Sequence, residues 1–242
     1  MIFELRQGSF ARGKRMLFEG LSLSVKGGEI LAILGQNGVG KTTLLQCLMG
    51  FLPLKTGACF IDGKNITSLS QRELFSKLSY VAQAKNHGFS LSVLDMVVLG
   101  LNTQIFLEPK KEHYKKASMM IERLNLEHLK NRTCDSLSGG ELGMVLFARA
   151  LVNEPSLIIL DEIESHLDFK NQLCILENLK ALQAEGRAII FNTHYPQNAK
   201  KLASKVLILE KNTHALAGAE LLNKTQLSKS FEVREEFFEH WL

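Results

Sequence analysis

The chain has 242 residues, of which 45% are apolar and 22% are charged, and its formal net charge at pH 7 is +4. This balance is typical of a globular chain with a buried core, and so small a charge does not indicate a nucleic-acid partner. The cysteines show no C-x-x-C spacing, which disfavours a zinc site or a disulfide framework and fits a reducing compartment. The N-terminus lacks the apolar stretch of a signal peptide, and no apolar run is long enough to span a membrane. We therefore expect a cytoplasmic protein that contacts membranes only through a partner.

The first part of the chain is predicted to consist of short strands. Apolar runs predict strands over residues 2–6, 21–25, 29–34 and 56–63. Gly27 and Gly28, between two of these runs, are interpreted as a hairpin turn. Phe10 falls in a basic, glycine-containing stretch, which we expect to be a loop.

A glycine-rich segment follows the third of these strands and precedes an amphipathic helix predicted over 41–49. It matches the pattern G-x-x-x-x-G-K-[ST], in which glycines let the backbone bend around an anion while N–H groups and the helix N-terminus bind polyphosphate. The lysine can reach the β- and γ-phosphates and the following threonine can ligate Mg²⁺. The segment therefore predicts a nucleoside triphosphate site. Its residues are Gly35, Gln36, Asn37, Gly38, Val39, Gly40, Lys41, Thr42 and Thr43.

The middle of the chain is predicted to be helical. A capped helix over 71–78 and a strand over 79–83 lead into a region, from about 88 to 154, without strand patterns but with helical periodicity at 93–99 and 110–124. Four lysines interrupted by Glu112 suggest either an anionic partner or, as the i,i+4 pairing favours, a solvated helix face. These lysines are Lys110, Lys111, Lys115 and Lys116.

Strands and helices alternate after residue 155. The pattern predicts strands over 156–160, 188–192 and 205–210, with helices over 171–185, from Pro196, and within 217–231. Such alternation favours a mainly parallel sheet covered on both faces. We expect the aromatic tail, 232–242, to dock on the body of the protein or on a partner.

Polar residues occur where three of the apolar strands end. Asp161 and Glu162 follow the run Leu157–Leu160, at the strand end where open α/β sheets bind ligands. Asp161 is predicted to hold Mg²⁺ and Glu162 to polarise an attacking water. Gln83 and His194 follow two other strands; Gln83 is expected to reach the metal or its water, and His194 the γ-phosphate or the nucleophilic water.

The run Leu137-Ser-Gly-Gly-Glu141 completes a pattern that resembles the ATPase subunits of ATP-binding cassette (ABC) transporters over nearly the whole chain. Besides the phosphate loop, the resemblance rests on Gln83, on Asp161-Glu162, on Ser165-His-Leu-Asp168 and on His194, in this order. It implies an α/β P-loop NTPase with a mainly parallel core sheet, an N-terminal antiparallel β subdomain and a helical subdomain. The expected division is a core over 1–87 and 155–242 and a helical signature subdomain over 88–154.

The resemblance also implies roles for residues on both faces of a head-to-tail homodimer that holds two ATP molecules. Ser138, Gly139, Gly140 and Glu141 would begin a helix that points at the γ-phosphate held by the other protomer, which agrees with the anion affinity of a capped helix N-terminus. Asp168 would connect the two sites, and Phe10 would stack on adenine. The expected catalytic set is Lys41, Gln83, Ser138, Gly139, Gly140, Glu162, Asp168 and His194.

A finer resemblance is to importers of iron–siderophore complexes, haem and cobalamin, carried by Arg72–Gln83 and Ser92–Gly100. It implies a permease whose cytoplasmic helix docks near Gln83–Gly100, an extracytoplasmic substrate-binding protein, and a location on the inner face of the cell membrane. Two alternatives stay open: an exporter ATPase, and an ABC ATPase that acts on nucleic acid or ribosomes. The sequence departs from similar sequences at a few positions, where hydrolysis or dimer coupling could differ. These are Gly143, Met144, Ile163, Glu164 and Tyr195.

Overall fold

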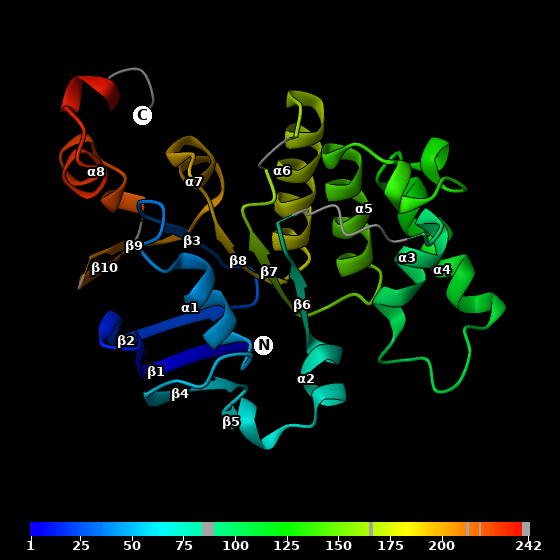
Figure 1. Cartoon of the computed structure of the whole chain (residues 1–242), viewed down its shortest axis with the longest axis horizontal. Coiled ribbons are helices and arrows are strands. Elements are labelled where there is room, and N and C mark those ends of the chain that lie inside the picture. Colours follow the sequence, from blue (N-terminus) through cyan, green and yellow to red (C-terminus); the bar gives the residue numbers. More distant parts are fainter. Residues whose placement is uncertain (84–89, 165–166, 212, 218, 239–242) are drawn as a thin grey trace. The chain divides into compact units, whose positions relative to one another are not determined.

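The computed structural model describes residues 1–83, 90–164, 167–211, 213–217 and 219–238. By their contacts these residues form two compact units, Met1–Ser70 with Leu179–Leu242, and Gln71–Asn178 (Figure 1). Each unit is α/β in character, and the expected fold class is confirmed.

The first unit contains an antiparallel sheet in the order β2-β1-β4-β5 and a second group in the order β10-β9-β3-β8. In the second group β3 is parallel to β8 and β9, whereas β10 is antiparallel to β9. Every residue of β3 and β8 is buried, because these strands carry only apolar side chains until the terminal asparagine of β8. The strands are β1 (Ile2–Arg12), β2 (Arg15–Lys26), β3 (Ile30–Leu34), β4 (Thr56–Ile61), β5 (Lys64–Asn65), β8 (Ala188–Asn192), β9 (Lys205–Glu210) and β10 (Thr213–Ala217).

Helices of the first unit include α1, which directly follows the phosphate loop, and α7, which packs on β3. The C-terminal helix α8 packs on β9, and Phe238 behind it is 3% exposed, so the described part of the tail docks on this unit. Trp241 lies outside the described residues. The elements are α1 (Lys41–Leu48), α7 (Pro196–Leu202), α8 (Lys224–Phe231) and the short 3-10 helices η1 (Ile66–Ser68), η5 (Ala219–Leu221) and η6 (Glu235–Phe238).

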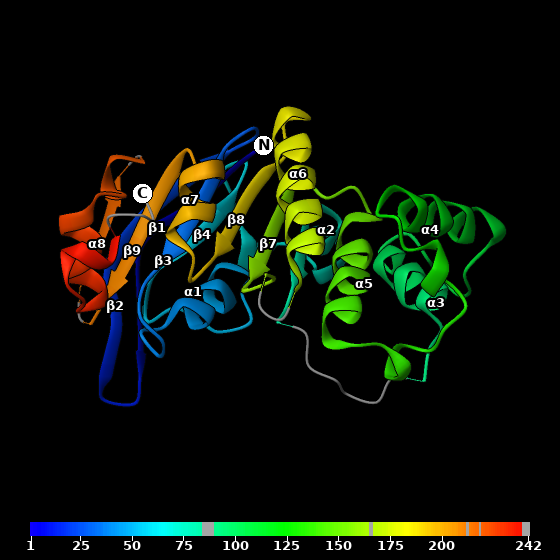
Figure 2. The same cartoon turned by 90° about the horizontal axis from the view of Figure 1, so that it is seen from above.

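The second unit is mostly helical around a parallel pair of strands, β6 and β7. Helices α3, α4 and α5 pack side by side (Figure 2) and bury an apolar face that includes Val97, Ile121 and Val145. The elements are α2 (Gln71–Lys77), β6 (Leu78–Val81), α3 (Val93–Val98), η2 (Leu99–Leu101), α4 (Lys111–Arg123), η3 (Glu127–Leu129), η4 (Cys134–Ser136), α5 (Gly139–Leu151) and β7 (Leu157–Asp161). Helix α6 (Phe169–Ala184) begins in this unit and ends in the first.

Two expectations about the N-terminal strands were wrong, and one C-terminal strand was not predicted. The hairpin turn lies at Gly13 between the paired strands β1 and β2, whereas Gly27 and Gly28 connect strands of different sheets. Phe10 lies on β1 opposite Phe18. Strand β1 continues past Arg6 through several register irregularities, and the polar residues there do not show the apolar pattern that predicts a strand. The segment 213–217 forms a strand that its composition does not predict, because it is poor in β-branched residues.

Candidate functional site

The phosphate loop is a turn in which glycine is required by backbone conformation. Gly35, Gly38 and Gly40 have φ angles of 145°, 73° and 121°, values that residues with a side chain rarely adopt. A Cβ atom on Gly35 would also lie 2.4 Å from the carbonyl oxygen of Leu209, so no larger residue fits there. The loop therefore keeps its backbone uncovered at the start of α1, as an anion site needs.

Lys41 lies within this loop and is only 4% exposed. Its Nζ donates hydrogen bonds to the carbonyl oxygens of Gly35, at 2.9 Å, and Gln36, at 3.2 Å. Both acceptors are neutral, and a charged phosphate oxygen is a stronger hydrogen-bond acceptor for an ammonium group than a carbonyl oxygen is. Thr42, next in the chain, is exposed at the beginning of α1.

In each unit, the carboxyl ends of two paired strands bring predicted site residues to the same edge of the sheet. In the first unit Ile33 of β3 is opposite Asn192 of β8, so the phosphate loop and His194 follow at the same edge of the sheet. In the second unit Val81 of β6 is opposite Leu160 of β7, so Gln83 and Asp161 also share an edge. Gln83 and His194 are both half-buried.

At the end of β7, Asp161 is buried and Glu162 is half-buried. The phenolic oxygen of Tyr80 donates a hydrogen bond to Oδ2 of Asp161 at 3.0 Å. Burial, and then the charge of Asp161, raise the pKa of Tyr80, so this phenol remains a donor. Tyr80 was not among the predicted site residues, although the parallel pairing of β6 with β7 places it opposite Ile159, two residues before Asp161.

Glu162 adopts a left-handed backbone conformation, with φ of 51°. Such a conformation costs a glutamate roughly 1–3 kcal/mol, and strained residues cluster at functional sites. The turn after β7 thus holds this carboxylate in a direction that an extended continuation of the strand would not give.

The signature segment begins α5 with a capping box. Ser138 Oγ accepts a hydrogen bond from the backbone N–H of Glu141 at 3.2 Å, and the Glu141 carboxylate accepts one from the backbone N–H of Ser138 at 2.8 Å. This backbone N–H is the main cause that lowers the pKa of Glu141, with a further contribution from Arg132. A side-chain hydrogen bond of Ser138 with the Glu141 carboxylate lowers the pKa of Glu141 further. Ser138 and Gly139 are exposed and Gly140 is half-buried.

Asp168 makes a structural contact in addition to its predicted role. Its Oδ1 accepts a hydrogen bond from the backbone N–H of Asn171 at 2.8 Å and so caps the first turn of α6. Phe169, the first residue of α6, is 90% exposed. Ser165 and His166, which precede Asp168 in the motif, lie outside the described residues.

Phe10, expected to stack on adenine, lies on β1 with its ring stacked on that of Phe18, at 6.2 Å between the ring centroids. It is half-buried, so part of the ring remains accessible. Its role toward adenine stays a prediction.

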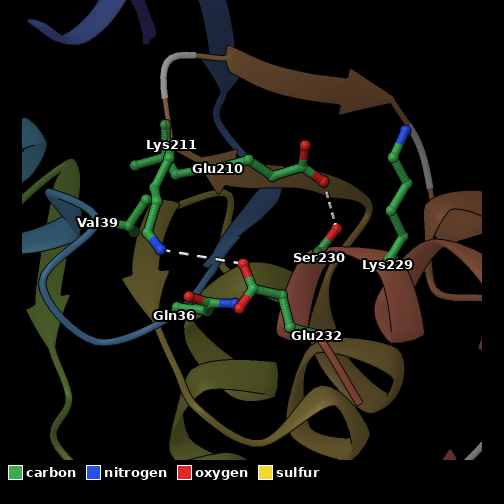
Figure 3. Close-up of a pocket in the computed structure, with 8 residues that line it drawn as sticks. Gln36, Val39, Glu210, Lys211, Lys229, Ser230 and Glu232 are labelled. Atoms are coloured by element: carbon green, nitrogen blue, oxygen red, sulfur yellow. Dashed lines mark hydrogen bonds and ion pairs between the residues drawn. The ribbon is translucent and has the colours of Figure 1, made fainter. Parts of the chain in front are cut away.

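A cavity of 170 Å³ borders the phosphate loop at Gln36 (Figure 3). Lys211 Nζ lies 3.9 Å from Oε1 of Glu232, and Ser230 Oγ donates a hydrogen bond to Oε1 of Glu210 at 2.6 Å. Two lysines and two glutamates line this cavity, so their formal charges cancel and the cavity does not favour an anion.

The buried strands, the glycine loop before α1 and the acidic end of β7 define a P-loop nucleotide-binding protein. The family model for the ABC transporter matches residues 18–165. The chain is 36% identical over 214 residues to a probable iron chelatin transport ATP-binding protein of Helicobacter pylori, covering 87% of this chain and 84% of that one. It is 35% identical over 248 residues to a molybdate import ATP-binding protein of Haemophilus influenzae, covering 97% and 93%. It also resembles a solved inward-facing metal-chelate type ABC transporter, with a TM-score of 0.83, 33% identity, and coverage of 95% and 88%.

The chain belongs to the ABC transporter family and is an ATP-hydrolysing subunit of that family. Subunits of this kind work with membrane permeases, and a solved cassette of the family is a dimer with ADP and phosphate bound. Within the described ranges of this chain, none of the helices combines the length and hydropathy that a membrane span requires.

Proposed function

We propose that this chain is the ATPase subunit of an importer for an iron–siderophore complex, haem or cobalamin. The observation that carries the ATPase part is the position of the buried Lys41 ammonium, which donates to two carbonyl oxygens of a turn that requires glycine at position 35. The substrate class is supported by the iron chelatin relative and the metal-chelate transporter. The molybdate importer among the relatives indicates molybdate as the alternative substrate class.

In this proposal the phosphate loop, Gly35–Thr43, binds the polyphosphate of ATP, and Phe10 contacts adenine. Glu162 orients the attacking water and His194 contacts the γ-phosphate or that water. The exposed start of α5, at Ser138–Glu141, binds the γ-phosphate held by a second copy, and Asp168 links the two sites. Positioning and charge neutralisation then provide most of the catalysis, as in phosphoryl transfer generally.

Mg²⁺ is the metal that we propose for this site, held by Thr42, Asp161 and Gln83. The described residues include no cluster of three or more histidine, cysteine, aspartate or glutamate side chains that could hold a metal by themselves. Hydroxyl, carboxylate and amide oxygens fit Mg²⁺, which typically takes one or two carboxylates and completes its shell with phosphate and water. When bound, the ion neutralises charge on the transferring phosphoryl group.

The proposed assembly is a homodimer on the cytoplasmic face of the membrane, joined to permease subunits and served by an extracytoplasmic substrate-binding protein. The permease segment docks on the second unit, near Gln83–Gly100. Of that stretch, residues 84–89 lie outside the described residues.

Replacing Glu162 by glutamine tests the proposal. The variant should bind ATP, stop turnover, and elute as an ATP-held dimer in size-exclusion chromatography. Glu154→Gln is the matched control, because Glu154 has the same left-handed φ of 51° but is exposed and outside the proposed site. Normal hydrolysis by Glu162→Gln would show that another group orients the water. Uptake by vesicles with the co-expressed permease, assayed with iron–siderophore, haem, cobalamin and molybdate, would then identify the substrate class.

A further inference from the structure

Arg149 is a half-buried cation without a carboxylate partner among the residues that the structure describes. It lies in the last turn of α5, and its Nη1 is 3.7 Å from the sulfur of Met96, which is a weak acceptor. Burial lowers the pKa of Arg149, as expected for a guanidinium withdrawn from water. The negative end of the α5 dipole offsets only part of this cost. Such a partly desolvated charge is costly unless it is paired.

The guanidinium borders a hollow of 380 Å³ on the second unit. Of the residues that line this hollow, Arg149 is charged, and the others are either apolar or polar without a charge. The lining is closely packed at Gly100, because a Cβ there would lie 2.0 Å from the carbonyl oxygen of Arg149. Leu99, on the rim, is 48% exposed. The neutral lining consists of Phe75, Leu78, Ser79, Tyr80, Leu99, Gly100, Asn102 and Ala150.

We propose that Arg149 binds a carboxylate on the permease segment that docks in this hollow, and that this ion pair is the anchor of the docking. The inference rests on the proposed function, in which a permease contacts this part of the second unit. Charge complementarity selects the occupant: a single cation in a hollow whose other lining residues are uncharged fits a segment with one acidic side chain. A planar guanidinium pairs with a carboxylate through two parallel hydrogen bonds, and the partial burial of Arg149 weakens competition from water.

The experiment uses this chain co-expressed with its permease subunits and purified in detergent. Arg149→Gln should weaken binding of the permease at least about tenfold and make the remaining binding less sensitive to salt. Arg149→Lys keeps the charge and should recover part of the affinity. The ATPase rate of the isolated chain should stay unchanged in both variants. Lys115→Gln removes the same charge from an exposed position on α4 and should leave binding intact.

Single replacements of the acidic residues in the cytoplasmic loops of the permease identify the partner. One such acid should cause the same loss as Arg149→Gln, and combining the two changes should cause little further loss. Exchanging the charges, with Arg149→Glu and arginine at that acid, should restore assembly. If the wild-type chain binds no permease, the proposed function itself fails. If it binds and Arg149→Gln binds equally well, or no permease acid is coupled to Arg149, the ion pair is refuted and the importer function stands.

Discussion

The hydroxyl of Tyr80, on β6, donates a hydrogen bond to the carboxylate of Asp161, at the end of β7. Tyr80 also lines the hollow that we assign to the permease. The Tyr80 side chain therefore forms part of the surface proposed for the permease and also contacts Asp161, the carboxylate proposed to hold Mg²⁺. A shift of β6 on docking would move a hydrogen bond of the metal ligand, which gives a short physical route between partner and nucleotide.

Tyr80→Phe tests this route, because phenylalanine keeps the ring and removes only the donor. Replacing a hydrogen-bonding partner of a metal ligand typically weakens metal binding 10–100-fold, so we expect about tenfold weaker binding of Mn²⁺ in the presence of ATP. Electron paramagnetic resonance of bound Mn²⁺ measures this without turnover. Metal-free ATP affinity should not change. Tyr114→Phe, on α4, is the control, and equal Mn²⁺ affinity in all three proteins would rule out a positioning role for Tyr80.

Gly35→Ala should lose both stability and nucleotide binding. The new methyl group would meet the carbonyl oxygen of Leu209, and alanine is strained at φ of 145°. We expect a loss of roughly 1–3 kcal/mol in the free energy of unfolding, measured by urea denaturation, and no ATP binding in calorimetry. Gly63→Ala separates the two causes: Gly63 also has a positive φ, of 78°, but a Cβ there has no neighbour within 4 Å. That control should lose less stability and bind ATP normally.

Asp168 carries two separable roles, the observed cap of α6 and the proposed link between the two ATP sites. Asp168→Ala removes the cap and should cost about 1 kcal/mol of stability. Asp168→Asn keeps an acceptor for the N–H of Asn171, so its stability should stay close to that of the wild type. If the charge also links the sites, Asp168→Asn should still lower the cooperativity of ATP hydrolysis. Wild-type kinetics in Asp168→Asn would leave capping as the whole role.

The fold was predictable from the sequence where a local pattern decides the structure. The strands around the phosphate loop are continuous apolar runs, and the P-loop glycines are required by local backbone angles, so both were located correctly. The path of β1 was not predictable, because its register shifts depend on pairing with β2. The Tyr80–Asp161 contact joins residues 81 positions apart and depends on the pairing of β6 with β7.

Stability at alkaline pH should depend on Cys47 and Cys59, which are buried in the first unit. The Cys59 thiol faces the carbonyl oxygen of Cys47 at 3.8 Å, and burial raises the pKa of each thiol from 9.0 to about 12. Above pH 9 the unfolded chain releases protons that the folded protein retains, so this contribution is complete below pH 9 and is lost as the pH rises toward 12. Each thiol should lower the free energy of unfolding by up to about 1.4 kcal/mol per pH unit in that window.

Urea denaturation at pH 8, 9 and 10 measures this slope, with a variant in which both cysteines are alanine as the control. All other titrating groups are shared, so the difference in slope between the two proteins isolates the thiols. The thiols should also resist iodoacetamide in the folded protein at pH 9, because only the thiolate reacts. Equal slopes, or alkylation of the folded protein as fast as of the unfolded chain, would show that these cysteines ionise freely.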